Sequence, residues 1–301
     1  MANVIIDTDP GSDDALALIM AFNSPDLDVL GITTVGGNAS IQDTTRNALS
    51  IIDHLGLRDI SVYQGEQHPF EGCFENAYAV HGSNGLGISL PEPTSTPSNT
   101  TAHQFITETA AVKRNNLLVI TLGPLTNLAL ALQAEDRLAH WISRVIVMGG
   151  AVRVPGNITP YAEFNVYNDP TSAEVVFNSG IPITLIGLEV TMKTSFSEAE
   201  YPWVCGESAN AHLARRILKS RFRSLQKGSD YKLHDPLAVI ATIKPNILQY
   251  QNVTIEVEKK GPERGHTTAV QHCGMVKLAV TVDDKAAKNF MVGLLSNIQG
   301  T

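Results

Sequence analysis

The chain has 301 residues, a formal net charge of −8 and 43% apolar residues. This length can bury a large core, and the acidic balance without a basic stripe argues against a nucleic-acid polymer or an anionic membrane as partner. Three widely separated cysteines, Cys73, Cys205 and Cys273, lack metal-binding spacing and suggest a reducing compartment. No apolar run can cross a bilayer, and a first strand from about residue 3 leaves no room for a signal peptide, so we expect a cytoplasmic protein.

Predicted strands and helices alternate along the chain. Short apolar, β-branched runs predict strands at 4–6, 27–35, 60–64, 117–122, 144–148 and 183–188. Runs of helix formers predict helices at 15–22, 41–55, 102–113, 171–178, 211–225, 237–243 and 286–298, with another opening after Gly123. Late strands at 253–257 and 276–282 are expected to form a hairpin or edge pair. The alternation predicts one α/β domain over residues 1–301, with an open, doubly wound, mostly parallel (Rossmann-like) sheet and helices on both faces.

Four carboxylates follow the first predicted strand in the stretch DTDPGSDD: Asp7, Asp9, Asp13 and Asp14. Pro10-Gly11 predicts a turn into the next helix, and ligands of open α/β sheets bind at this edge of the strands. Like charges this close repel one another and are costly to bury, and bound Ca²⁺ or Mg²⁺ would offset that cost. We favour an ion site over the alternative, a solvated acidic turn with Ser12 or Asp13 as N-cap.

Glycine, amide and carbonyl groups follow two further predicted strands. Gly36 and Gly37 let the backbone approach a ligand closely, and Asn38 offers both a donor and an acceptor. A plain turn with Asn38 in a left-handed conformation is an equal alternative. The backbone carbonyls of Thr121 and Leu122 end another strand and could bind a hard cation.

Asn157, Glu163 and Asn165 precede the helix predicted at 171–178. Together they could bind a polyol, because each hydroxyl needs a donor and an acceptor. The alternative is capping chemistry, which fits Asp169 before Pro170 well and fits Glu163 less well.

Two histidines stand out. His81 lies in a long irregular segment, 65–101, and is either an exposed surface residue or part of a lid that meets the substrate. His234 precedes Asp235 at the start of a later helix. The basic residues of the helix expected at 211–225, from Arg215 to Arg223, are interpreted as a solvated face.

A pocket of these residues would be rich in Asp and Asn and poor in Lys and Arg. That composition disfavours phosphate and favours a neutral, hydroxyl-rich ligand such as a sugar. No Ser–His or Cys–His pair is evident, so water is the expected nucleophile. A cation would lower the pKa of a bound water, and a nearby Asp would take its proton.

At these residues the chain resembles the calcium-dependent nucleoside hydrolases of the inosine–uridine-preferring family. DTDPGSDD matches the family signature D-x-D-P-G-x-D-D. The match continues in family order through Gly37-Asn38, HGSNGLG (81–87), GPLTN (123–127), MGG (148–150), GNITPYAEFN (156–165) and HDP (234–236). The resemblance implies hydrolysis of the N-glycosidic bond of small-molecule ribonucleosides to ribose and free base. It also implies assembly as a homodimer or homotetramer.

The resemblance further implies roles for individual residues. Ca²⁺ would be held by Asp9, Asp14, Asp235 and the backbone carbonyl of Leu122, where the family often has Thr. Asp9 would be the general base on the Ca²⁺-bound water. The ribose hydroxyls would be bound by Asp13, Asn38, Asn157, Glu163 and Asn165. His81 and His234 would lie near the base, and His234 would protonate it as it leaves. The segment with Phe222 and Tyr231 varies in the family, so the preferred base stays open.

Two other functions compete with this one. A phosphohydrolase of the haloacid dehalogenase kind is suggested by Asp7-Thr8-Asp9, but a phosphate-binding Lys near a later acidic pair is not found. A non-catalytic nucleoside- or ribose-binding protein would be expected to lose Asp9 or the Asp14–Asp235 pair, and all three are present. We therefore expect the hydrolase.

Overall fold

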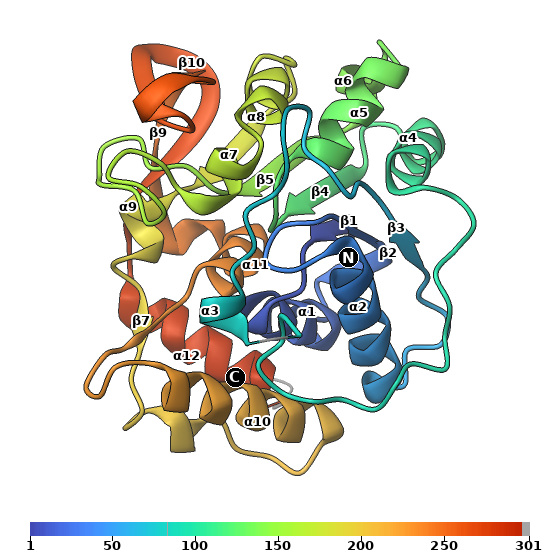
Figure 1. Cartoon of the computed structure of the whole chain (residues 1–301), viewed down its shortest axis with the longest axis vertical. Coiled ribbons are helices and arrows are strands. Elements are labelled where there is room, and N and C mark those ends of the chain that lie inside the picture. Colours follow the sequence, from blue (N-terminus) through green and yellow to red (C-terminus); the bar gives the residue numbers. More distant parts are fainter. Residues whose placement is uncertain (83, 297–301) are drawn as a thin grey trace.

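One sheet of eight strands runs through the molecule (Figure 1). The computed structural model describes residues 1–82 and 84–296, without the side chains of 271–273. The strand order is β3-β2-β1-β4-β5-β6-β10-β9. The strands are β1 (Ala2–Thr8), β2 (Leu27–Thr34), β3 (Val62–Gln64), β4 (Leu117–Thr121), β5 (Arg144–Met148), β6 (Ile183–Ile186), β9 (Leu248–Val257) and β10 (Thr267–Val282). Every neighbouring pair is parallel except β10 and β9.

Helices cover both faces of this sheet (Figure 1). One face carries α1 (Ser12–Asn23), α2 (Ile41–Leu55), α10 (Ala209–Ser224), α11 (Asp235–Ile243) and α12 (Asp284–Leu295). The other carries α4 (Ala102–Lys113), α5 (Thr126–Ala134), α6 (Leu138–Trp141) and α8 (Pro170–Phe177). Strand β1 serves both cores, because successive side chains point to opposite faces: Val4 and Ile6 enter one core and Ile5 the other. The predicted doubly wound α/β fold is confirmed.

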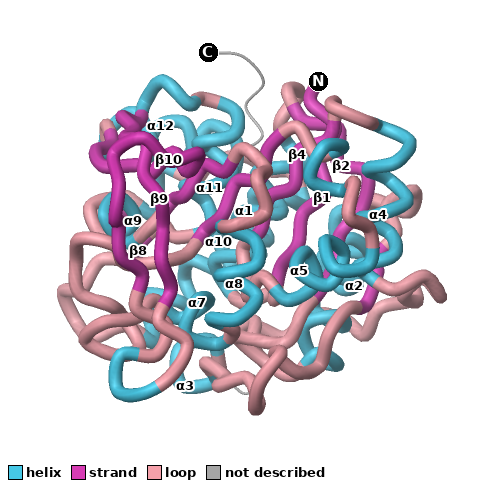
Figure 2. The backbone as a smooth tube through the Cα atoms, turned by 90° about the horizontal axis from the view of Figure 1, so that it is seen from above, coloured by secondary structure: helices cyan, strands magenta, loops and turns pink. Residues whose placement is uncertain are grey.

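The late hairpin closes one edge of the sheet. Strands β9 and β10 pair antiparallel, and β10 pairs parallel with β6 on its other side. Figure 2 shows the two long strands side by side. The predicted hairpin is therefore confirmed, although both strands begin earlier than their apolar runs indicate.

Helix ends follow capping chemistry. The bounds of α2 agree with the prediction because Ser40 accepts a hydrogen bond from the backbone N–H of Asp43, and Gly56 ends the helix at φ 72°. Asp169 caps α8 as predicted, accepting from the Ser172 N–H. In α1 the N-cap is Gly11, so capping by Ser12 or Asp13 is wrong.

Several short elements were not predicted. They are the helices α3 (Tyr78–His81), α6 (Leu138–Trp141), α7 (Phe164–Asn168) and α9 (Leu188–Thr191), the small sheet of β7 (Ser195–Phe196) and β8 (Tyr231–Lys232), and 3₁₀ turns at Tyr201–Trp203, Pro245–Ile247 and Gly261–Glu263. A helix of one turn is too short to leave a 3.6-residue periodicity in the sequence. The helix expected to reach Ile298 is seen to Leu295, and 297–301 lie outside the described residues. No helix in the described ranges is long and apolar enough to cross a membrane.

The strand order reverses between β1 and β4. The chain adds β2 and β3 on one side of β1 and then returns to place β4 on the other side. Loops that leave two such strands diverge, and the crevice between them is where open α/β sheets bind ligands. Asp9 follows β1 and Leu122 follows β4, so the topology brings these two residues to one crevice.

Helix α4 offers a matched test of the core. Ile106 is fully buried and Val112 is 81% exposed on the same helix. We expect Ile106→Ala to lower the free energy of unfolding by about 2–5 kcal/mol through lost burial and a cavity. Val112→Ala should change it by less than about 0.5 kcal/mol. Equilibrium unfolding in urea measures both values, and equal losses would contradict the described packing of α4.

Candidate active site

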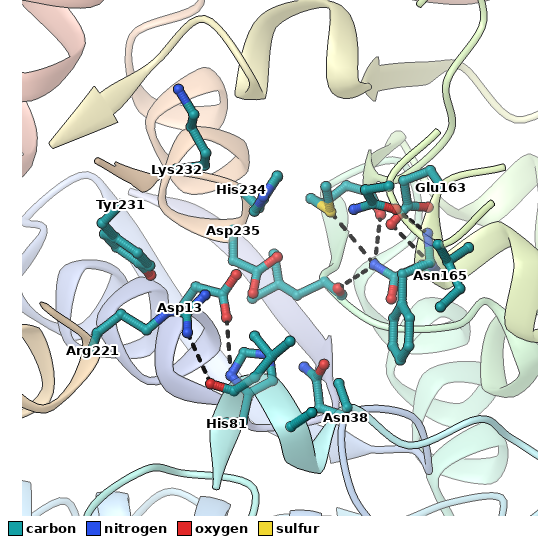
Figure 3. Close-up of a pocket in the computed structure, with 18 of the residues that line it drawn as sticks. Asp13, Asn38, His81, Glu163, Asn165, Arg221, Tyr231, Lys232, His234 and Asp235 are labelled. Carbon is teal, nitrogen blue, oxygen red and sulfur yellow. Dashed lines mark hydrogen bonds and ion pairs between the residues drawn. The ribbon is translucent and has the colours of Figure 1, made fainter. Parts of the chain in front are cut away.

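A cavity of about 350 Å³ opens at the crevice between β1 and β4 (Figure 3). Its lining includes nine of the residues predicted from the sequence: Asp13, Asn38, His81, Leu122, Asn157, Glu163, Asn165, His234 and Asp235. The other two predicted residues, Asp9 and Asp14, are fully buried behind this lining. The fold thus brings residues that are far apart in the sequence to one cavity: Asp9 and Asp235 are separated by 226 positions.

Asp9 is enclosed by backbone. Its Oδ2 accepts a hydrogen bond from the Asn38 N–H at 2.7 Å, and its Oδ1 has no partner among the described residues. A Cβ at Gly37 would lie 2.1 Å from Oδ2, and one at Gly123 would lie 2.6 Å from Oδ1. Gly37 therefore makes room for the Asp9 carboxylate itself. Asn38 does not adopt a left-handed conformation, so the plain-turn alternative is wrong.

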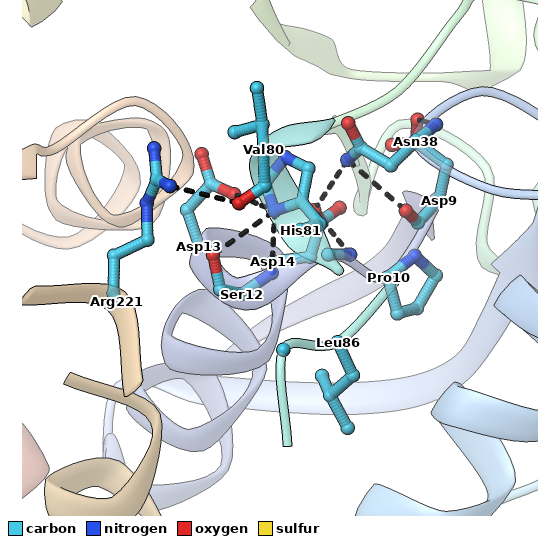
Figure 4. Close-up of polar contacts among 12 residues, drawn as sticks. Asp9, Pro10, Ser12, Asp13, Asp14, Asn38, Val80, His81, Leu86 and Arg221 are labelled. Carbon is cyan, nitrogen blue, oxygen red and sulfur yellow. Dashed lines mark hydrogen bonds and ion pairs between the residues drawn. The ribbon is translucent and has the colours of Figure 1, made fainter. Parts of the chain in front are cut away.

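Asp14 and Asp7 are also fully buried, which excludes the solvated acidic turn. Figure 4 shows Asp14 beside Asp9 and Asn38. Asp14 Oδ1 accepts from the Thr8 hydroxyl at 2.5 Å, and its Oδ2 accepts from Gly11 N–H and Asn38 Nδ2. Asp7 Oδ1 accepts from the Thr33 hydroxyl and from Asn127 Nδ2, whereas its Oδ2 lacks a partner in the described structure.

Burial and mutual repulsion disfavour ionisation of these carboxylates. Burial raises the pKa of Asp7 to about 6, against the lowering effect of its two donors. Burial, and then the charge of Asp14, raise the pKa of Asp9 well above its usual value. The pKa of Asp235 is raised well above its ordinary value by the same two causes. The cluster therefore needs a positive charge if its members are all to be ionised at neutral pH.

The donor set fits a hard divalent cation. Carboxylate oxygens of Asp13, Asp14 and Asp235 lie within 4.8 Å of one another. Asp13 Oδ1 and Asp9 Oδ1 are buried without hydrogen-bond partners among the described residues. The Leu122 carbonyl accepts from Asn165 Nδ2 at 2.7 Å and keeps a second lone pair. Asp13, which the family resemblance assigns to the sugar, thus lies in the acidic group that could hold the metal, as the acidic stretch itself predicts.

Glu163 caps the short helix α7. Its Oε1 accepts from the Asn165 N–H, and its Oε2 accepts from the N–H groups of Val166 and Gly150. The expectation that capping fits Glu163 less well is therefore wrong, although the residue still lines the cavity. Burial raises the pKa of Glu163 despite these donors. Asn157 Oδ1 likewise accepts from the N–H of Phe164.

His81 is buried, so the exposed-surface interpretation is wrong. Its Nδ1 accepts from the backbone N–H of Ser12 at 3.1 Å, which places the ring proton of the neutral form on Nε2. A Cβ on Gly11 would lie 2.8 Å from Nδ1, so this contact requires glycine. Burial lowers the pKa of His81. Ser83, in the same sequence motif, lies outside the described residues.

His234 is oriented by a residue that the sequence did not single out for that role. Its Nδ1 lies 3.0 Å from the hydroxyl of Thr191, at the end of the unpredicted helix α9. Burial lowers the pKa of His234. The imidazole is therefore held by one nitrogen and lines the cavity with the rest of its ring.

The far end of the cavity contains Tyr231, from the segment expected to bear on base preference, and two basic residues that were not predicted to line it. Arg221, Tyr231 and Lys232 line it. The solvated-face interpretation is wrong for Arg221, whose Nη1 donates to the carbonyl of Val80 at 2.9 Å. Phe222 is not in the lining; its ring packs 6.4 Å from that of Phe196. Arg221 thus faces the cavity and its neighbour Phe222 faces the core, a difference that the basic composition of the segment does not reveal.

Known proteins resemble this chain over nearly its whole length. The family model for inosine-uridine preferring nucleoside hydrolases matches residues 4–289. Uridine nucleosidase 1 of Arabidopsis thaliana is 39% identical over 272 residues, covering 88% of this chain and 80% of that protein. A solved plant nucleoside hydrolase, PpNRh1, superposes with a TM-score of 0.93 at 30% identity, covering 98% of this chain and 99% of that one. A purine-preferring ribonucleoside hydrolase from Gardnerella vaginalis gives 0.92 at 29% identity, with 98% of both chains covered.

The chain belongs to the inosine-uridine preferring nucleoside hydrolase family. The predicted activity is confirmed: the protein is a hydrolase of small-molecule ribonucleosides. The phosphohydrolase and the non-catalytic binding protein are set aside. The named relatives differ in the base that they prefer, uridine in one and purines in another, so membership does not fix the base.

Proposed function

We propose that this nucleoside hydrolase adds water to C1′ of the ribose, with Asp9 as the general base and Ca²⁺ as the bound metal. The observation that carries this proposal is the buried, unpartnered Oδ1 of Asp9 beside the carboxylates of Asp13, Asp14 and Asp235. Oxygen-only ligands favour Ca²⁺ or Mg²⁺ over softer metals.

Asp9, Asp14, Asp235 and the Leu122 carbonyl would hold the metal, with Asp13 close to it. When bound, the cation supplies the positive charge that keeps these carboxylates ionised and acidifies an adjacent water. Ionised Asp9 then takes the proton of the attacking water. Asn38 fixes the direction of this carboxylate by donating to its other oxygen.

The sugar would lie against Asp13, Asn38, Asn157, Glu163 and Asn165. Their carboxylate and amide groups can accept from and donate to hydroxyls in the cavity lining. As the glycosidic bond weakens, positive charge develops on the ribosyl ring, and the surrounding carboxylates stabilise it. Direct attack by water predicts inversion at C1′.

The base would lie near His81 and His234. We propose that His234 donates a proton to the departing base. Its Nδ1 contact with Thr191 supports this role, because a fixed ring directs Nε2 consistently.

We also propose that residues 1–301 form a single domain, since one sheet joins the N-terminal strand to the late hairpin. A homodimer or homotetramer and a cytoplasmic location stay predictions from the family resemblance.

The first prediction of this mechanism concerns the metal. Reducing-sugar release should be measured for uridine, inosine, cytidine, adenosine and guanosine, with Ca²⁺ and with a strong chelator. We expect release without added phosphate, lost on chelation and restored by Ca²⁺. Release that is unaffected by the chelator would contradict a metal-dependent role for the acidic cluster.

Asp9→Asn tests the general base. We expect kcat to fall by on the order of 10²–10⁴-fold, because the amide cannot accept the proton of water. The fold should persist, since the change removes a buried charge that its neighbours repel. The matched control is Asp28→Asn, an exposed carboxylate on β2 that should leave kcat unchanged. Near-normal turnover of Asp9→Asn, with an unchanged melting temperature, would exclude the role.

His234→Ala tests leaving-group protonation. We expect a loss of on the order of 10²-fold or more with inosine or uridine, and a small loss with p-nitrophenyl riboside, whose leaving group needs no proton. His140→Ala, at an exposed histidine, serves as control. Equal losses on all three substrates would instead indicate that His234 only shapes the cavity.

A further inference from the structure

Arg221 lies at the cavity with part of its guanidinium unpaired. Nη1 donates to the Val80 carbonyl at 2.9 Å and to the Ser224 hydroxyl at 3.2 Å. Nε is buried and has no acceptor among the described residues. No carboxylate in the described part of the chain lies within 4.0 Å of this guanidinium as an ion-pair partner. Nη2 makes no hydrogen bond to the described residues and is not buried, so it is the donor left to meet an acceptor that arrives with the ligand.

The ring of Tyr231 lies beside this group. The guanidinium carbon of Arg221 lies 5.9 Å from the ring centre. With Nη1 already anchored to Val80, the side chain presents a held donor instead of a mobile charge. Such a donor suits a carbonyl oxygen that takes up negative charge.

The cavity is electrically polarised along its length. Figure 3 shows Arg221 and Tyr231 on one side and Glu163 and Asn165 on the other, with Asp13 and Asp235 between them. Asp13, Asp235 and Glu163 border the space proposed for the sugar, Arg221 lies with Tyr231 at the end left for the base, and Asp230 also lines the cavity. This polarity matches the transition state of glycosidic cleavage, in which the ribosyl group becomes positive and the base negative.

We infer that Arg221 selects nucleosides whose base carries a carbonyl at C6 of a purine or at C4 of a pyrimidine, as in hypoxanthine and uracil, where the oxygen takes up negative charge as the base departs. The C1′–N bond breaks with its electron pair going to the base, and the charge spreads onto the carbonyl oxygen that Arg221 contacts. Water oxygen bonds to C1′ and its proton goes to Asp9, while the base gains a proton from His234 or from solvent. The inference rests on ribonucleoside hydrolysis at this cavity.

Amino-substituted bases provide the contrast. Adenine has an amino group where hypoxanthine has a carbonyl, and cytosine has one where uracil has a carbonyl. An amino group is a donor, and the guanidinium has donors only, so the pair leaves both groups unsatisfied. Sites built around such a hydrogen bond discriminate strongly against ligands that cannot make it.

Arg221 also ties the segment that carries His81 to helix α10, so the test must separate this tether from contact with the base. Arg216 provides the matched control. It lies on the same helix and donates from Nη2 to the Ser89 carbonyl at 2.9 Å, but it does not line the cavity. Loss of either tether should affect all substrates alike.

The experiment compares wild type, Arg221→Gln, Arg221→Lys and Arg216→Gln. For each, kcat/KM is measured on the pairs inosine–adenosine and uridine–cytidine in the presence of Ca²⁺. We expect wild type to favour the carbonyl member of each pair. Arg221→Gln should reduce that preference by on the order of 10²-fold, Arg221→Lys should restore it in part, and Arg216→Gln should leave it unchanged.

Three outcomes overturn the inference: a wild type that favours adenosine and cytidine, equal losses on both members of each pair in Arg221→Gln, or the same change in Arg216→Gln. If Arg221→Gln does not fold, the inference is tested by two other measurements: the preference of the wild type for the carbonyl member of each pair, and the change of that preference in Arg221→Lys. Absence of ribose release from every nucleoside in wild type would instead refute the hydrolytic mechanism itself, so the two failures are distinguishable.

Discussion

The constraint on which the structure depends is the burial of several carboxylates at the end of one strand. Asp7, Asp9 and Asp14 lie within eight positions, and burial raises the pKa of each. The charge of Asp14 further raises the pKa of Asp9, and the charge of Asp13 further raises that of Asp14. The surrounding fold answers with donors: hydroxyls from Thr8 and Thr33, amides and backbone N–H groups. These contacts offset part of the repulsion but leave oxygens of Asp7 and Asp9 without partners in the described structure. A fold that concentrates negative charge in this way is prepared for a cation and for a substrate that becomes positive.

Room for these groups comes from glycines at the ends of neighbouring strands. Gly37 and Gly123 stand so close to the Asp9 carboxylate that any Cβ there would collide with it. The reversal of strand order between β1 and β4 creates the crevice. Because Gly37 and Gly123 have no side chains, the Asp9 carboxylate fits at the floor of this crevice. Topology and local chemistry therefore act together: the sheet decides where a site can form, and the glycines decide that Asp9 fills it.

The fold and the sugar end of the cavity could be predicted because they rest on local patterns. Alternating apolar runs gave the sheet, and polar residues after the strands gave the part of the lining that we propose binds the sugar. The rest depends on contacts between distant segments. The capping role of Glu163 requires helix α7, which is too short to leave a pattern. The contact of Thr191 with His234 joins residues 43 positions apart. The direction of Arg221 on α10 depends on a segment more than a hundred residues earlier, at Val80.

The two ends of the cavity are formed by different structural elements, and this difference bears on how base preference can vary within one family. The carboxylates are anchored at the ends of central strands, where a change would disturb both the core and the metal site. The base end is formed by α10, the short strand β8 and the segment that carries α3, which can change without altering the sheet. Relatives named for uridine and for purines match this chain over most of its length, at 39% and 29% identity. In our inference an acidic end held by the sheet and an exchangeable base end account for that combination, and the residue that selects the base, Arg221, is one that the signature motifs do not contain.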